Sequence, residues 1–311
     1  MKNTSIQMLC FFLIVLGKNG FAQQDPMYSM YLFDKMLINP AYTGSSNWAV
    51  GTLKYRQQFI GMDGSPVTET FNFHSPVQKK HIGWGFKIIN DKIAVNSNIN
   101  ASLFYAYHLN FAGGKLSFGL EGGIYNRKID FTKLILNNPI DNSIPSIPMN
   151  STVPDGSCGI YYQKKQFYAG LSDCHLLGNT FNYKTTNAPK SHLYSNLNYI
   201  MGNIFDLNEK WSFEPSMLVK YQPAAPIQAD VNAMLAYKNF IAAGVQYRTG
   251  DAVAVFFKIT IVENLRIAYA FDKTISGLTP YSRGANEIII SYGIKLPPPA
   301  MEKEIHPRYY F

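Results

Sequence analysis

Apolar and polar side chains alternate along most of the chain, from about Trp48 to Leu296. Leu116 and Phe118, for example, are separated by Ser117, and the same alternation continues to Ile124. A period of two places successive side chains on opposite faces of a β-strand. Stretches of this kind recur between short polar turns, so the pattern predicts an all-β chain whose strands each have one apolar and one polar face.

The alternating stretches predict fourteen strands, and an even number is usual for single-chain bacterial outer-membrane barrels. We expect the strands near residues 47–59, 66–75, 81–90, 95–109, 114–127, 157–163, 166–174, 190–204, 209–222, 226–238, 239–249, 251–262, 264–273 and 286–296.

The expected connections alternate in length along the chain. Those after even-numbered strands are all short, whereas three of those after odd-numbered strands are long: Ile129–Gly156, His175–Pro189 and Lys273–Ala285. Short periplasmic turns and long outer loops are typical of outer-membrane barrels, and a soluble β-sandwich has no reason to sort its loops in this way.

The first 22 residues have the layout of a cleaved secretory signal. Lys2 precedes an apolar core from Met8 to Leu16, and small residues Gly20 and Ala22 follow, so we expect cleavage after Ala22. No later run of about 18 apolar residues suggests a transmembrane helix. An exported chain that spans the outer membrane with strands fits both observations.

The composition favours a surface that faces lipid. Charged residues make up 15% of the chain and aromatic residues 14%, whereas soluble domains contain about 25% charged residues. The net charge of +8 lies partly in turns and accompanies no recognised nucleic-acid-binding module. We therefore expect a transmembrane antiparallel β-barrel and no nucleic-acid partner.

In lipid every backbone polar group needs a partner, so the sheet must close into a cylinder. A Lys or Arg facing the middle of the bilayer would cost roughly 2–4 kcal/mol, so charged side chains of the strands should face the lumen. We assign Lys87, Glu121, Glu214, Lys220, Asp230, Lys258, Arg266, Asp272, Glu287 and Lys295 to the lumen, and Trp84, Phe86, Ile88, Ile288, Ile290 and Tyr292 to lipid. These charges either form ion pairs across the lumen or are solvated wall residues.

Residues 23–46, between the signal and the first strand, are too apolar for a free tail. Seven positions suggest a short helix with one buried side: Met27, Tyr28, Met30, Tyr31, Phe33, Met36 and Leu37. We expect Asn39–Pro40 to end this helix, because the residue before a proline avoids the helical conformation. Gly44 suits a tight turn. Such a segment must pack on the lumen, the barrel rim or a partner, so we expect it to plug or cap the barrel.

This segment resembles the start of the mature chain in the PorP/SprF family of the type IX secretion system of Bacteroidetes. The residues that carry the resemblance are Gln23, Gln24, Pro26, Tyr28, Met30 and Tyr31, then Asn39, Pro40, Ala41, Tyr42 and Gly44. The resemblance covers some twenty residues, and beyond them only the general strand pattern agrees.

The resemblance implies an integral outer-membrane protein that supports secretion or surface attachment of proteins with a C-terminal sorting domain, including gliding-motility adhesins. It implies type IX secretion components, such cargo and outer-membrane lipid as partners, and it implies neither catalysis nor a cofactor. The residues that we assign to binding are those of the N-terminal motif: Tyr28, Tyr31, Asn39, Pro40, Ala41, Tyr42 and Gly44.

Enzymatic and metal-dependent functions have little support in the sequence. His74, His108, His175 and His192 lie in no nucleophile or base motif, and no cluster of His or Cys has metal-ligand spacing. Cys158 and Cys174 fall on two strands of one expected hairpin but out of register, so a disulfide between them stays open as an alternative.

The expected organisation is a signal peptide (1–22), the N-terminal segment (23–46), the barrel (47–296) and a periplasmic tail (297–311). Three consecutive prolines, Pro297–Pro299, should keep the tail out of the sheet. Two other functions remain open beside secretion: a transporter or porin for a small solute, and a structural protein of the outer membrane.

Overall fold

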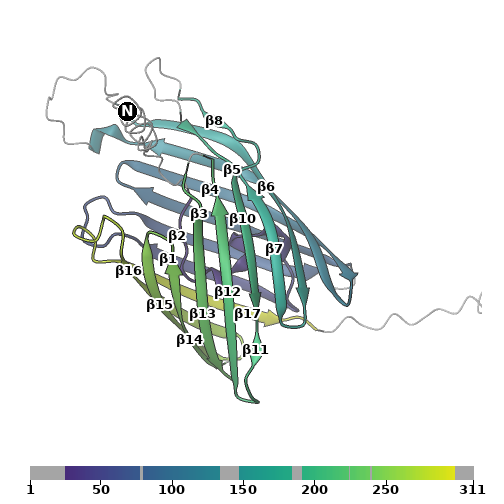
Figure 1. Cartoon of the computed structure of the whole chain (residues 1–311). Coiled ribbons are helices and arrows are strands. Elements are labelled where there is room, and N and C mark those ends of the chain that lie inside the picture. Colours follow the sequence, from purple (N-terminus) through teal and green to yellow (C-terminus); the bar gives the residue numbers. More distant parts are fainter. Residues whose placement is uncertain are drawn as a thin grey trace, which may run out of the picture.

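A closed antiparallel β-barrel forms the body of the molecule (Figure 1). The computed structural model describes residues 25–77, 80–133, 147–183, 191–223, 225–238 and 240–297, so the expected signal peptide and nearly all of the expected tail lie outside the described residues. The main sheet contains fifteen strands, one of which, the two-residue β11, continues β10 along β12. The other fourteen form the ring, which the pairing of the first strand with the last one closes. The predicted fourteen-stranded barrel is thereby confirmed.

The strand bounds follow the predicted segments closely. The fourteen strands of the ring are β1 (Trp48–Gln57), β2 (Val67–Val77), β3 (Ile82–Ile93), β4 (Asn96–Phe111), β5 (Gly114–Ile129), β6 (Met149–Lys164), β7 (Phe167–Cys174), β10 (Asn196–Asn203), β12 (Trp211–Tyr221), β13 (Gln228–Tyr237), β14 (Ile241–Arg248), β15 (Ala252–Val262), β16 (Leu265–Thr274) and β17 (Ala285–Lys295); β11 is Phe205–Asp206.

Side chains along each strand alternate between the lumen and the outer surface. Leu103 on β4 is 70% exposed, whereas its neighbours Ser102 and Phe104 are each 4% exposed. The assigned lumen residues follow the inward positions of their strands, and seven of them are buried: Lys87, Glu121, Glu214, Lys220, Asp230, Asp272 and Glu287. The outer surface is apolar, as a wall in contact with lipid requires.

Two strands begin at other residues than the alternation predicts. β6 starts at Met149 rather than near residue 157, because its added outward positions, Asn150 and Thr152, are polar and give no apolar face to detect. β10 starts at Asn196 rather than near residue 190. Ser191–His192 (β9) instead pairs with Thr180–Phe181 (β8) in a separate two-stranded ribbon.

The lengths of the connections alternate as expected. The long connections, 130–148, 175–195 and 275–284, all follow odd-numbered strands of the ring, and we call the end of the barrel where they lie the long-loop end. The opposite end, where β1 begins, is the short-turn end, which in outer-membrane barrels faces the periplasm. Within the described residues, no helix has the length and apolar character needed to cross a membrane.

Candidate functional site

Residues 25–47, the N-terminal plug, run through the lumen from one end of the barrel to the other. At the long-loop end, the Asp25 carboxylate accepts a hydrogen bond of 3.0 Å from Asn196 Nδ2. At the short-turn end, Lys115 Nζ donates to the Ser45 carbonyl oxygen at 3.2 Å. The plug lies inside the ring of strands in Figure 1, which confirms the expectation that this segment occupies the barrel.

The plug folds into three short 3-10 turns rather than the expected helix. They are η1 (Tyr31–Phe33), η2 (Lys35–Leu37) and η3 (Pro40–Tyr42). Asn39 is extended, as a residue before proline should be. It begins η3 by accepting a 2.9 Å hydrogen bond from the Ala41 N–H at its side-chain oxygen. The helix prediction was wrong because the buried residues of the plug face different walls of the lumen and do not share one stripe.

Asn39 fastens η3 to the barrel wall. Its Nδ2 donates to the carbonyl oxygens of Ile160 on β6 at 3.0 Å and Leu171 on β7 at 3.2 Å. Ser172 Oγ donates to the Ile38 carbonyl oxygen at 2.6 Å beside it. The side chain of Asn39 therefore bridges two adjacent wall strands while it also caps η3.

Glycines of the wall make room for this close approach. A Cβ added to Gly119 on β5 would overlap the backbone of Pro40 and Ala41, and one added to Gly159 on β6 would overlap the Asn39 side chain. Gly44 has φ +67, a left-handed conformation that glycine adopts without steric cost. It lies against the backbone of β2 and β3. The end of the motif therefore requires glycine on both the plug and the wall.

The tyrosines of the motif contact several walls of the lumen. The Tyr28 hydroxyl lies 3.0 Å from Thr70 Oγ1 on β2, and the Tyr31 hydroxyl accepts from Asn232 Nδ2 on β13. The Tyr42 ring packs edge-on against Tyr161 of β6 with 5.4 Å between centroids. Burial raises the pKa of Tyr28, Tyr31 and Tyr42, so all three hydroxyls stay protonated.

The predicted binding residues all lie inside the lumen, where they are spread along the plug from Tyr28 to Gly44. Four of them, Tyr28, Tyr31, Asn39 and Ala41, are 5% exposed or less, and Pro40 is also buried. Their visible partner is the barrel's own wall. Their role in binding another protein stays a prediction.

A cluster of buried charges at the long-loop end holds the start of the plug. Arg56 on β1 pairs with Asp272 on β16 at 2.6 Å and with Glu287 on β17 at 3.0 Å. The Glu287 carboxylate also accepts from the backbone N–H groups of Ser29 at 2.7 Å and Met30 at 3.2 Å. This carboxylate therefore joins the closing strand of the barrel, the first strand and the plug.

Arg248 on β14 completes the cluster from the other side. It pairs with Asp230 at 3.0 Å and donates to the Tyr28 carbonyl oxygen at 3.2 Å. The sequence reasoning proposed ion pairs across the lumen but missed both arginines. Their signal was available, because Arg56 follows the inward positions Thr52 and Lys54 along β1.

His175 fastens the plug to the rim of the barrel just after β7. Its Nδ1 lies 2.7 Å from the Asp155 carboxylate and its Nε2 lies 2.8 Å from the Asp25 carboxylate. Burial lowers the pKa of His175, but the two carboxylates outweigh burial and raise the pKa to about 10. The ring is therefore an imidazolium that donates on both sides, and we call this arrangement the His175 latch.

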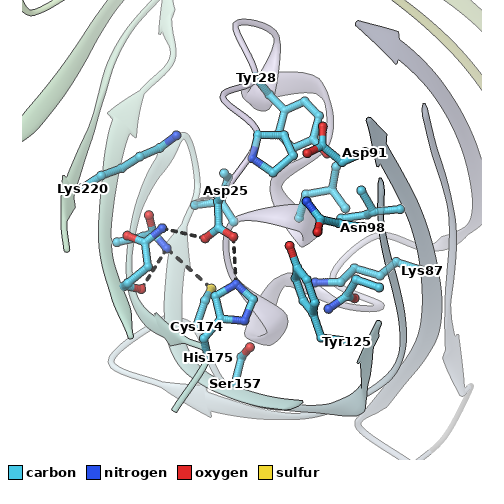
Figure 2. A pocket seen from close by; sticks show the side chains of 17 residues that line it. Asp25, Tyr28, Lys87, Asp91, Asn98, Tyr125, Ser157, Cys174, His175 and Lys220 are labelled. Atoms are coloured by element: carbon cyan, nitrogen blue, oxygen red, sulfur yellow. Dashed lines mark hydrogen bonds and ion pairs between the residues drawn. The ribbon is translucent and has the colours of Figure 1, made fainter. Parts of the chain in front are cut away.

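A cavity of about 70 Å³ lies beside the His175 latch, between the plug and the wall (Figure 2). Asp25, Tyr28, Lys87 and Lys220 are among the side chains that line it. Small-molecule pockets commonly measure about 300–1,000 Å³. This cavity has room for ordered water molecules rather than for a solute of drug size.

His108, one of the histidines considered for catalysis, lies in a buried site without the partners that catalysis requires. His108 Nδ1 lies 2.7 Å from Ser117 Oγ, but Ser117 is 1% exposed and no described carboxylate contacts this pair.

Cys158 and Cys174 are free thiols. Cys158 takes an outward position on β6 and Cys174 an inward position on β7, so the alternative of a disulfide between them is wrong. Among the described residues, no group of three or more His, Cys, Asp or Glu side chains could hold a metal ion.

Solved structures with a similar fold are outer-membrane transporters. The toluene transporter TbuX of Ralstonia pickettii has a TM-score of 0.51 and 10% identity, covering 84% of this chain and 93% of that chain. The monoaromatic hydrocarbon channel CymD has a TM-score of 0.50 and 12% identity, covering 90% of this chain and 96% of that chain. At such identities the likeness concerns the fold alone. No curated protein matches the chain.

A family model describes almost the whole chain. The model of the type IX secretion system membrane protein PorP/SprF matches residues 20–292, which include the whole plug and nearly the entire barrel. The matched family consists of membrane proteins of a secretion system, and the fold is that of an outer-membrane β-barrel. The chain therefore belongs to the PorP/SprF family of type IX secretion system membrane proteins.

Proposed function

We propose that this barrel supports the secretion or surface attachment of proteins that carry a C-terminal sorting domain, such as gliding adhesins. In this role it acts in the outer membrane as a platform that binds type IX components and their cargo. The observation that carries the proposal is the family match over residues 20–292 together with a lumen that the plug crosses from end to end.

A filled lumen suits a platform better than a conduit. The plug is bonded to the wall at the His175 latch, at Glu287 and at Asn39, so three separate attachments hold it along its length. A folded cargo protein could pass through the barrel only if all of these contacts broke. Cargo and secretion components therefore bind the ends or the outer face of the barrel, and the motif residues act by keeping the lumen shut.

The test is surface display in the native host. The gene is deleted, and a reporter protein fused to a type IX sorting domain is followed by surface labelling of intact cells. We expect the reporter to accumulate in the periplasm without this barrel and to reach the surface when the gene is restored. Normal display in the deletion strain would contradict the proposal.

A second measurement addresses the alternative of a small-solute transporter. The purified barrel is placed in planar lipid bilayers, with a variant that lacks residues 25–38 as the matched open control. We expect little conductance from the intact chain and a large one from the shortened chain. Solute-dependent conductance through the intact chain, with unchanged surface display in the deletion strain, would favour the transporter.

A further inference from the structure

Four cationic side chains surround the short-turn mouth of the lumen on one side of the barrel. Lys258, Arg266 and Lys295 occupy inward positions of β15, β16 and β17, and Lys238 lies in the turn after β13. Arg266, Lys238 and Lys295 are exposed and Lys258 is half-buried. The group is therefore accessible from the side of the membrane that the short turns face.

No described carboxylate lies within ion-pair distance of these four cations. Two of them lie near aromatic rings instead: Lys258 Nζ is 5.5 Å from the Phe33 ring of the plug, and Lys295 Nζ is 6.0 Å from the Trp48 ring. Glu263 lies in the same region. Among the described side chains it forms no ion pair with them, so the mouth keeps an excess of positive charge.

Three of the four cations line a hollow rather than a flat surface. The hollow measures about 570 Å³, and its lining includes the cations Lys238, Lys258 and Arg266, the single carboxylate of Glu263, and Trp48, Phe240 and Thr260. At this end the plug is fastened to the opposite wall, where Gly44 lies against β2 and β3 and Ala41 against Gly119 of β5. The hollow on the side of β13 to β17 is therefore left open by the plug.

We propose that this hollow, the basic mouth, binds an acidic segment of a periplasmic protein. Clustered like charges in a recess with low-dielectric walls raise the local concentration of an oppositely charged partner and speed its binding. The aromatic rings of Trp48 and Phe240 add apolar contact area beside the cations. Anionic lipid headgroups have the matching charge, but the side chains take inward positions and turn away from the bilayer.

The proposed function requires that the barrel has a partner in the periplasm, and the inference rests on it for that requirement alone. It adds the chemical class of that partner. Its test needs no cells. The full chain in neutral detergent is titrated with fluorescein-labelled deca-L-glutamate, and binding is followed by fluorescence anisotropy. We expect saturable binding that weakens as salt is raised, since exposed charges are screened beyond about 10 Å at 0.1 M ionic strength.

Two variants decide the question. Each lacks two positive charges at the short-turn end, but at a different site. K258Q/R266Q lies in the basic mouth and should weaken binding about tenfold, whereas K164Q/K165Q lies in the β6–β7 turn and should change it less than about twofold. Both variants retain the strand pattern, and their unfolding midpoints should match that of the original chain.

Three results would overturn the proposal. They are no binding by the original chain, equal loss in both variants, and displacement of the peptide by micellar phosphatidylglycerol at the basic mouth. The reporter could also reach the surface of cells that lack the barrel while the purified chain still binds the peptide. That result would contradict the secretion role but not the proposed binding site at the basic mouth.

Discussion

At the long-loop end of the lumen, Arg56 and Arg248 each lie within 3.0 Å of a carboxylate, whereas at the short-turn end Lys258 and Arg266 have no carboxylate partner among the described residues. The first pair is buried and bonded to the plug. The second pair borders an open hollow. Charges that are matched and buried fix one arrangement of the chain, while charges that are unmatched and accessible are left for a partner molecule.

The largest expected effect comes from breaking the matched end. Glu287→Ala would leave the Ser29 and Met30 N–H groups without an acceptor and remove one carboxylate from Arg56. Removing one partner from a buried ion pair typically costs about 3–5 kcal/mol. We expect a loss of that size in the free energy of unfolding, measured by urea titration of the barrel in lipid vesicles.

The matched control for this variant is Glu263→Ala at the short-turn end. Glu263 is exposed, so its removal should change the free energy of unfolding by no more than about 0.5 kcal/mol. Equal losses of unfolding free energy in the two variants would show that the carboxylates at the two ends contribute equally to stability.

The His175 latch makes stability depend on pH. The folded chain raises the pKa of His175 from 6.5 to about 10, so the latch contributes fully below pH 6.5 and loses its contribution as the pH rises through 10. Between pH 6 and pH 9 we expect the original chain to lose about 3 kcal/mol of stability relative to His175→Gln. Parallel pH profiles of the two chains would refute the latch.

A smaller effect is expected where the plug touches the glycines of the wall. Gly119→Ala places a Cβ on the backbone of Pro40 and Ala41, and overpacking of this kind costs about 1–3 kcal/mol. Gly122→Ala on the same strand is the control, because nothing lies within 4 Å of its added Cβ. Unfolding titrations should show a lower stability for Gly119→Ala than for Gly122→Ala. Indistinguishable curves would mean that the close contact between the plug and Gly119 is not needed for stability.

The smallest effect is expected from the basic mouth itself. Arg266→Gln removes an exposed cation with no described ion pair, so the free energy of unfolding should change by less than about 0.5 kcal/mol. The measurement is the same urea titration. A loss above 1 kcal/mol would mean that Arg266 is part of the fold rather than free for a partner.

The barrel could be predicted from the sequence because one surface of it meets lipid. That solvent forces an apolar residue at every second position, and the signal is strong at Leu103 or Ile288. It fades where a strand leaves the membrane, as at Asn150 and Thr152 of β6, and there the prediction stopped short. The period of two therefore reports the lipid-facing surface rather than the full length of the strands.

The lumen could be predicted only in part. The alternation placed Asp272 and Glu287 inside, but it could not say that Arg56 would lie between them, because that contact joins the first strand to the last two. The buried residues of the plug do not form a single stripe. Its conformation therefore depends on contacts with wall strands that lie far from it in the sequence. The motif nevertheless singled out residues that contact the wall closely, since Asn39 donates to two wall strands and Gly44 lies against the backbone of β2 and β3. Its role in binding another protein stays a prediction.

The attachment of Ser29 and Met30 to Glu287 has a consequence for how the chain is assembled. Glu287 belongs to the last strand, and the plug leads directly into the first one, so the seam between these strands and the plug's anchorage share the same residues. Joining the first strand to the last one and anchoring the plug therefore depend on one carboxylate, so closure of the cylinder and enclosure of its contents are energetically coupled.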